Sequence, residues 1–188
     1  MEDNNPFKKP PVNIRDKDSS QTNEESEDTK RFESNLRQII EDFSTQSKIM
    51  IDALYERQQN RLTPLQNNEQ FQGMVSHIKN IKNFEEKFNI ESIEKINENI
   101  NKLSRLFNDM KFQPVGNRMA EDSQNVEKLI SGAKIFSASC QESGRKLPIE
   151  MENKKMEEKS KELRLSLDRL SREVQNLWMF AVKLRENM

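Results

Sequence analysis

The apolar residues of the last part of the chain, residues 148–188, follow the most regular pattern in the sequence. They stand alternately four and three residues apart, at Leu163, Leu167, Leu170, Val174, Leu177, Ala181 and Leu184. This is the heptad spacing of a helix that packs along one seam against other helices. Of the two lines of the seam, one is apolar from its start, with Ile149 and Met156, and the other begins with the polar residues Asn153 and Ser160. Because one helix cannot bury such a seam alone, the pattern predicts further helices beside it.

Three more helical segments precede this one. Apolar residues recur at helical spacing in residues 29–62, 64–112 and 118–143. Pro64 separates the first two segments because the residue before a proline avoids the α-helical region. Pro114 and Gly116 form the clearest turn signal in the chain. Connections this short favour antiparallel neighbouring helices.

The ends of the helices have recognisable signals. Asp28 or Thr29 is expected to cap the first helix, Ser143 with Gly144 to end the third, and Pro148 to open the last. Gly132 lies inside the third segment, where it marks either a close approach of two helices or the weakest helix.

The second segment contains a change of register. Its first seam runs through Phe71, Met74, Ile78 and Ile81, and its second seam, from Ile93 to Met110, is displaced by one residue. The change falls at residues 88–92. Two interpretations are open. The helix breaks there and a new one is capped by Asn89 or Ser92, or a continuous helix changes the face it presents. Because no glycine or proline stands at that point, we favour a continuous, distorted helix.

Residues 1–28 have too few apolar side chains to offset the entropy of ordering, and we expect a disordered tail. The tripeptide Asn5, Pro6 and Phe7 within it matches the motif that EH domains of endocytic adaptors recognise. A chance match in a flexible arm is the alternative interpretation.

Composition limits the core and the classes of partner. Apolar residues make up 32% of the chain and charged residues 34%, whereas an ordinary domain has roughly 45–50% and about 25%. The 31 basic residues nearly balance the 32 acidic ones, so we expect no nucleic-acid binding. No apolar run is long enough for a transmembrane segment. A single cysteine, Cys140, excludes an internal disulfide and favours an intracellular protein.

No residue pattern indicates catalysis or metal binding. His77 is the only histidine and stands at the edge of the face formed by Met74 and Ile78, where a surface role is expected. Cys140 stands on an apolar stripe, which is typical of a small buried side chain. The four glycines are too far apart for a phosphate-binding loop. We therefore expect no enzymatic activity, no cofactor, no metal and no small-molecule substrate.

Residues 177–182 are apolar all round the last helix. Trp178 and Phe180 stand beside the seam, whereas Met179 and Val182 point outwards. Either this end packs within a bundle of three or more helices, or Trp178 and Phe180 anchor a partner protein. Contact with a membrane surface is not favoured, because the flanking charges are mixed and the apolar run is short.

Together these patterns predict an all-α, elongated helical bundle or coiled coil with a disordered N-terminal tail. We expect other helical subunits to close most of the seam. A hetero-oligomer is favoured over a homodimer. The chain would then be a non-catalytic scaffold or adaptor of a chromosome-segregation, meiotic or microtubule-organising complex, cytoplasmic, cytoskeletal or nuclear. The alternative is a vesicle-trafficking adaptor that recruits an EH-domain protein. The predicted partner-binding residues are Leu163, Leu167, Leu170, Val174, Leu177, Trp178, Phe180 and Leu184.

Overall fold

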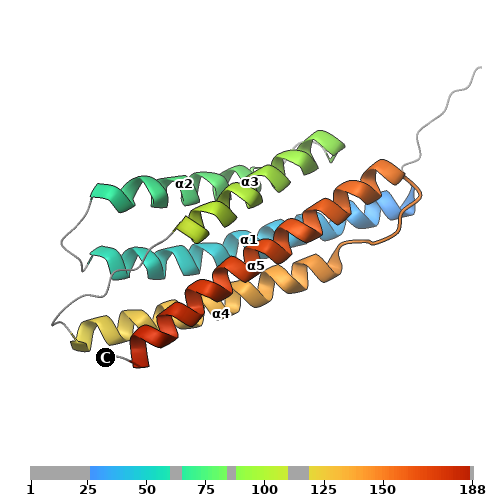
Figure 1. The fold of residues 1–188 in the computed structure, drawn as a ribbon. Helices are drawn as coiled ribbons and strands as arrows, with labels where there is room; N and C mark the ends of the chain where they lie inside the picture. Colours follow the sequence, from blue (N-terminus) through green and yellow to red (C-terminus); the bar gives the residue numbers. More distant parts are fainter. Residues whose placement is uncertain (1–25, 60–64, 84–87, 110–118, 187–188) are drawn as a thin grey trace, which may run out of the picture.

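The structure, a computed structural model, describes residues 26–59, 65–83, 88–109 and 119–186. These ranges form five helices and contain no strand (Figure 1). The helices are α1 (Glu27–Gln59), α2 (Leu65–Lys82), α3 (Ile90–Asp109), α4 (Met119–Lys146) and α5 (Lys154–Glu186). The prediction of an all-α helical bundle is confirmed. The tail tripeptide and the predicted turns at Pro64 and at Pro114 and Gly116 lie outside the described residues.

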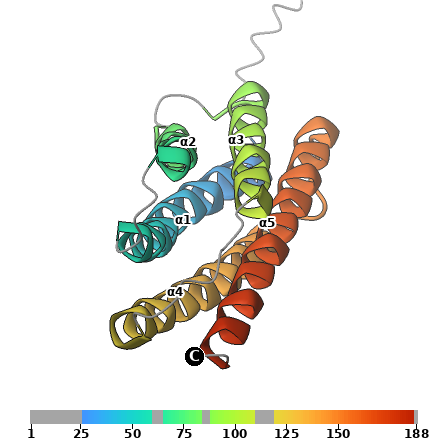
Figure 2. The same cartoon turned by 60° about the vertical axis from the view of Figure 1, so that its left-hand side comes forward.

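The helices form a closed ring around one core. Extensive contacts join α1 to α2 and α4, α5 to α3 and α4, and α2 to α3. The order around the ring is therefore α1, α2, α3, α5, α4 and back to α1. In Figure 2, α2 and α3 lie on the side of the bundle away from α4, so that α2 packs extensively on α1 and α3 alone.

Pairs of contacting residues give the direction of each helix. Where α4 meets α5, Ser137 contacts Ser171 and Gly144 lies beside Arg164, so the two helices run antiparallel. Figure 1 shows the same reversal between α1 and α2. α3 and α5 run parallel. Lys159 of α5 lies 3.0 Å from Glu94 of α3, and further along both helices Arg169 of α5 donates a hydrogen bond to Asn101 of α3.

The centre of the bundle is aromatic. Phe43 of α1 and Phe107 of α3 both pack against Phe136 of α4, with ring centroids 5.3 and 6.2 Å away. All three side chains are buried. Burying an apolar side chain of this size contributes about 1.5–3 kcal/mol relative to leaving it exposed. This cluster joins three helices that are distant in sequence.

The preference for a continuous helix through residues 88–92 is wrong. α2 ends at Lys82 and α3 begins at Ile90. The two helices run antiparallel, because a Cβ added to Gly73 would lie 3.3 Å from Leu106 and Asn80 donates a hydrogen bond to Asn99. Neighbouring residues on a helix point about 100° apart, so a straight helix would direct the two displaced seams differently. Folding back lets both seams face one core.

Side chains cap the helices near the positions expected. The backbone N–H of Ser92 donates to Asn89 Oδ1 at 2.8 Å, and the N–H of Asn89 donates to Ser92 Oγ at 3.0 Å. This reciprocal pair is a capping box, and it starts α3. Ser26, which accepts a 3.3 Å hydrogen bond from the N–H of Thr29, precedes α1. The cap of α1 is thus Ser26 and neither Asp28 nor Thr29.

The last helix begins at Lys154 and does not begin at Pro148. Asn153 Oδ1 accepts hydrogen bonds of 3.1 and 3.2 Å from two backbone N–H groups of the first turn. Glu157 accepts hydrogen bonds from the ammonium groups of Lys154 and Lys161 and from the N–H of Met151. These three donors stabilise the carboxylate and lower the pKa of Glu157 to about 2. Asn153, predicted to be a polar position of the seam, is therefore the cap of α5.

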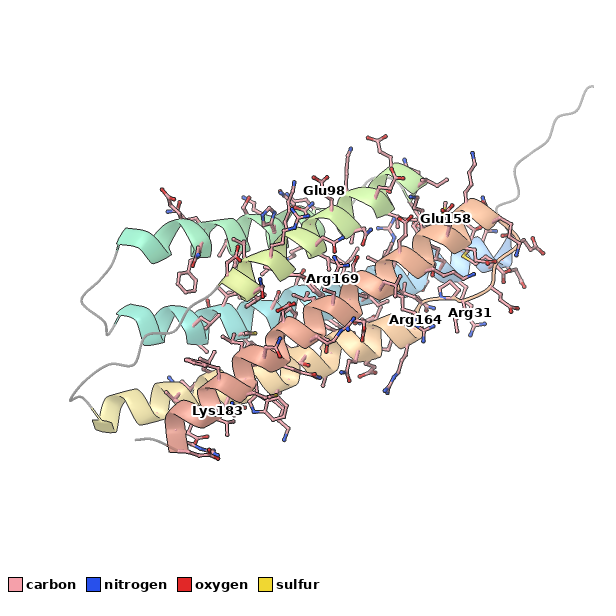
Figure 3. All side chains as sticks on the ribbon, viewed as in Figure 1. Arg31, Glu98, Glu158, Arg164, Arg169 and Lys183 are labelled. Carbon is pink, nitrogen blue, oxygen red and sulfur yellow. The ribbon has the colours of Figure 1, made fainter. Side chains whose placement is uncertain are left out.

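α4 continues past its predicted end at Ser143 and Gly144, which lie inside the helix and are buried. A Cβ added to Gly144 would lie 3.6 Å from Cγ of Arg164, which is labelled in Figure 3. A Cβ added to Gly132 would lie 3.4 Å from the Met50 Cα of α1. The small residues therefore let neighbouring helices approach closely. For Gly132 this confirms the first of the two interpretations.

Candidate interaction surface

The apolar seam of α5 is filled within the chain. Leu163, Leu167, Leu170 and Val174 have no exposed surface, and Leu177 is 5% exposed. All five belong to one core together with buried residues of the other four helices. The expectation that other subunits close most of the seam is therefore corrected. Five of the eight predicted partner-binding residues do not lie at the surface.

Polar residues near the seam of α5 also have partners inside the chain. Ser160 is fully buried, and its hydroxyl donates a 2.6 Å hydrogen bond to the carbonyl of Pro148. Ser171 is fully buried and donates to the carbonyl of Ser137, whose hydroxyl lies 2.9 Å from that of Ser171. A buried hydroxyl without such a partner would cost roughly 1–3 kcal/mol. These bonds therefore favour one register of α5 on α4.

The contact between Ser137 and Ser171 could not be predicted from the sequence. Serines on a helix are usually solvated, and nothing in either local pattern pairs two serines that are 34 residues apart. The one available signal is that Ser171 stands directly beside the seam residue Leu170.

The C-terminal end of α5 is the part of the predicted interface that remains at the surface. Met179 is 55% and Phe180 38% exposed, and Trp178 is half-buried against the core. The ammonium group of Lys134, on α4, lies 5.9 Å from the centre of the Trp178 ring, which holds this ring against α4. Lys183 marks this end of α5 in Figure 3. The side chain of Leu184 lies outside the described residues.

A groove with apolar side chains runs between α1 and α2. We call it the α1–α2 groove; its volume is about 660 Å³. It is lined by Ser44, Thr45, Lys48, Ile49, Ile51 and Asp52 of α1 and by Val75, Ile78, Lys79 and Lys82 of α2. Ile49 and Val75 are 51% and 53% exposed. This surface was not predicted from the sequence, because its two walls come from different helices.

Basic and acidic side chains one turn apart form ion pairs along α5. Arg172 lies 2.8 Å from Asp168 one turn earlier, and Lys161 lies 2.6 Å from Glu157. Ion pairs one turn apart on a helix surface stabilise the helix only weakly. Their basic groups are thus already partnered within the helix.

His77 and Cys140 occupy the positions expected of structural residues. His77 is half-buried, and its Nδ1 lies 2.9 Å from Asn99 Oδ1 on α3. Cys140 is 1% exposed, and burial raises the pKa of its thiol far above the ordinary value. This thiol therefore lacks the lowered pKa and the accessibility that a reactive cysteine needs.

Neither a metal site nor a membrane-spanning helix is indicated within the ranges that the structure describes. No three or more His, Cys, Asp or Glu side chains within those ranges stand together in a way that could hold a metal ion. No helix in the same ranges is long and apolar enough to cross a membrane.

Comparison with models of protein families, with curated protein sequences and with solved structures gives no match to this chain. The surfaces of the bundle are therefore the basis for a functional interpretation.

Proposed function

We propose that this chain is a non-catalytic scaffold or adaptor that binds another helical subunit through the C-terminal end of α5. The observation that carries the proposal is the exposure of Met179 and Phe180 beside the half-buried Trp178. Large aromatic and sulfur-containing side chains that cluster at a surface are typical of protein interfaces. A partner helix packed on this end would bury both exposed side chains and complete the cover of Trp178.

The assembly that we propose is a hetero-oligomeric helical complex of chromosome segregation, meiosis or microtubule organisation. The support is by analogy: small, charged, helical subunits occur in such complexes. The balanced charges of α5 would then select a partner by electrostatic complementarity at the rim of the interface.

Replacing Met179 and Phe180 together with serine should abolish binding of the partner and leave the bundle folded, because both side chains are already exposed. The measurement is affinity purification of the tagged full-length chain, with far-UV circular dichroism as the folding control. The matched control is Leu165→Ser, also on α5 and 67% exposed. We expect the wild type and L165S to recover the same partner and the double variant to lose it.

Trp178 gives this test a second readout, since it is the only tryptophan of the chain. A partner that covers the end of α5 should shift its fluorescence emission to shorter wavelength. Recovery of the same partner by the double variant would contradict the proposed interface. Replacing Leu170 or Leu177 with glutamate cannot test this interface. Both side chains are buried, so a charge there would unfold the bundle and abolish binding indirectly.

The alternative proposal is a vesicle-trafficking adaptor that recruits an EH-domain protein through Asn5, Pro6 and Phe7. Its support is the tripeptide itself. Phe7→Ala should remove binding to a purified EH domain in a titration with the full chain. Equal affinity of the wild type and F7A would exclude this function.

A further inference from the structure

The α1–α2 groove has an apolar floor that the bundle leaves open to solvent. Ile51 is buried and Ile78 half-buried, whereas Ile49 and Val75 are about half exposed on the two walls. All the residues that line the groove belong to α1 and α2, and α2 has its extensive contacts with α1 and α3 alone. Exposed apolar side chains on two facing helices form a larger continuous patch than single surface residues do.

Both rims of the groove carry lysine. Lys48 stands on the α1 side, and Lys79 with Lys82 on the α2 side. No ion pair within the described residues joins any of the three to a carboxylate. Asp52 is the one acidic residue of the lining. The groove therefore combines an apolar floor with a net positive rim.

The dipole of α2 explains only part of this charge. Lysines in the last turn of a helix are stabilised by the negative end of the helix dipole, which accounts for Lys79 and Lys82. Lys48 lies in the middle of α1, where the dipole exerts no such effect. Its position opposite the other two places positive charge on both sides of the floor.

From these observations we propose that the α1–α2 groove binds an acidic amphipathic helix of a partner protein. A groove between two helices accepts a third helix, whose apolar side chains enter the groove at i, i+3 and i+4 spacing. On α1 the lining extends from Ser44 to Asp52, which is about 12 Å or rather more than two helical turns. Carboxylates on both flanks of the bound helix would pair with the lysines on both rims. This surface is separate from the C-terminal end of α5.

A second groove, near the start of α1, shows why the charge matters. It is lined by Arg31, Arg145 and Lys146 but also by Asp28 and Glu150. Its mixed charges favour neither an acidic nor a basic partner.

The test uses two synthetic peptides of about 18 residues, long enough to hold some helix. They share leucines at the a and d positions of the heptad and differ at the flanking e and g positions, which are Glu in one and Lys in the other. Each dye-labelled peptide is titrated with the full chain at low salt, and binding is followed by fluorescence anisotropy. We expect the Glu peptide to bind at least about tenfold more tightly than the Lys peptide, and salt to weaken its binding.

Two variants locate the binding site. Replacing Ile49 and Val75 with serine should weaken binding of the Glu peptide by about tenfold or more. Replacing Lys79 and Lys82 with glutamate should reverse the preference between the peptides. The matched controls are Ile135→Ser, which removes an apolar side chain of similar exposure from α4, and Lys155→Glu, which reverses an exposed charge on α5. Neither control should change the affinity.

Several results would overturn the proposal. These are no binding of the Glu peptide at about 1 mM, equal affinity for both peptides, or an unchanged affinity of I49S/V75S. A wild-type dimer that I49S/V75S converts to monomer would assign the groove to a second copy of this chain. Binding to anionic phospholipid vesicles that requires Lys79 and Lys82, without binding of the Glu peptide, would assign it to a lipid surface.

The emission of Trp178 separates this proposal from the proposed function. The Glu peptide should leave the emission unchanged, because Trp178 does not line the α1–α2 groove. The opposite result would be a Glu peptide that shifts the Trp178 emission and that binds I49S/V75S but not the variant with serine at Met179 and Phe180. Such a peptide binds at the end of α5. This result would contradict the groove proposal and leave the proposed function intact.

Discussion

Replacing Phe136 with alanine should lower the free energy of unfolding by roughly 3–5 kcal/mol. Phe136 is fully buried in α4, and its ring contacts those of Phe43 on α1 and Phe107 on α3. Removing the ring leaves a cavity where three helices meet, and it also removes the aromatic contacts. Urea denaturation followed by far-UV circular dichroism measures the loss.

The neighbouring residue provides the control for this prediction. Ile135 is 49% exposed on the same helix, so Ile135→Ala should change the free energy of unfolding by no more than about 0.5 kcal/mol. Equal, small effects of F136A and I135A would contradict the burial of Phe136 between α1 and α3.

Replacing Leu170 with alanine should destabilise the isolated chain by about 2–5 kcal/mol. The reason is that its side chain is fully buried by other helices of the same chain. If a partner subunit buried this side chain instead, the stability of the isolated chain would barely depend on it. The measurement is urea denaturation of the purified protein at several concentrations, because a loss within a monomer does not depend on protein concentration.

The control on the same helix is Leu165→Ala. Leu165 is 67% exposed and points away from the seam, so L165A should have an effect within about 0.5 kcal/mol. If L170A had an effect only at high protein concentration, the seam would be buried between subunits and not within one chain.

The positions of the helices could be predicted because their signals are local. Apolar spacing placed α1 and α4 to within a few residues at the ends that the structure describes, whereas α5 begins at Lys154 and was predicted to begin at Pro148. The errors lie at the ends, where a local signal competes with packing. Pro148 can open a helix. In the structure, however, its carbonyl accepts a hydrogen bond from the hydroxyl of Ser160, and α5 begins only after Asn153.

The break between α2 and α3 could have been found from the sequence. Asn89 and Ser92 cap each other's backbone N–H groups, and the displacement of the two seams occurs at the same place. The absence of glycine and proline was the weaker signal, because a polar cap is enough to start a helix. Two seams that face one core require the chain to reverse there.

The candidate site was only partly predictable. The apolar end of α5 stands out in the sequence, and the structure leaves Met179 and Phe180 exposed there. The α1–α2 groove does not stand out, since Ile49 and Val75 are single apolar residues on different helices. Only their positions on facing walls make them a surface.

By itself, the sequence determined that this protein is all-α, that its last helix has an apolar seam, and that small residues such as Gly132 stand at particular positions on the helices. These properties depend on residues within a few turns of one another. Only the tertiary structure decided that α1, α2, α3 and α4 enclose the core with α5, and that Ser137 pairs with Ser171. The physical reason is that burial is non-directional: a heptad seam must be covered by apolar surface, but nothing in its spacing specifies whether that surface belongs to the same chain or to another.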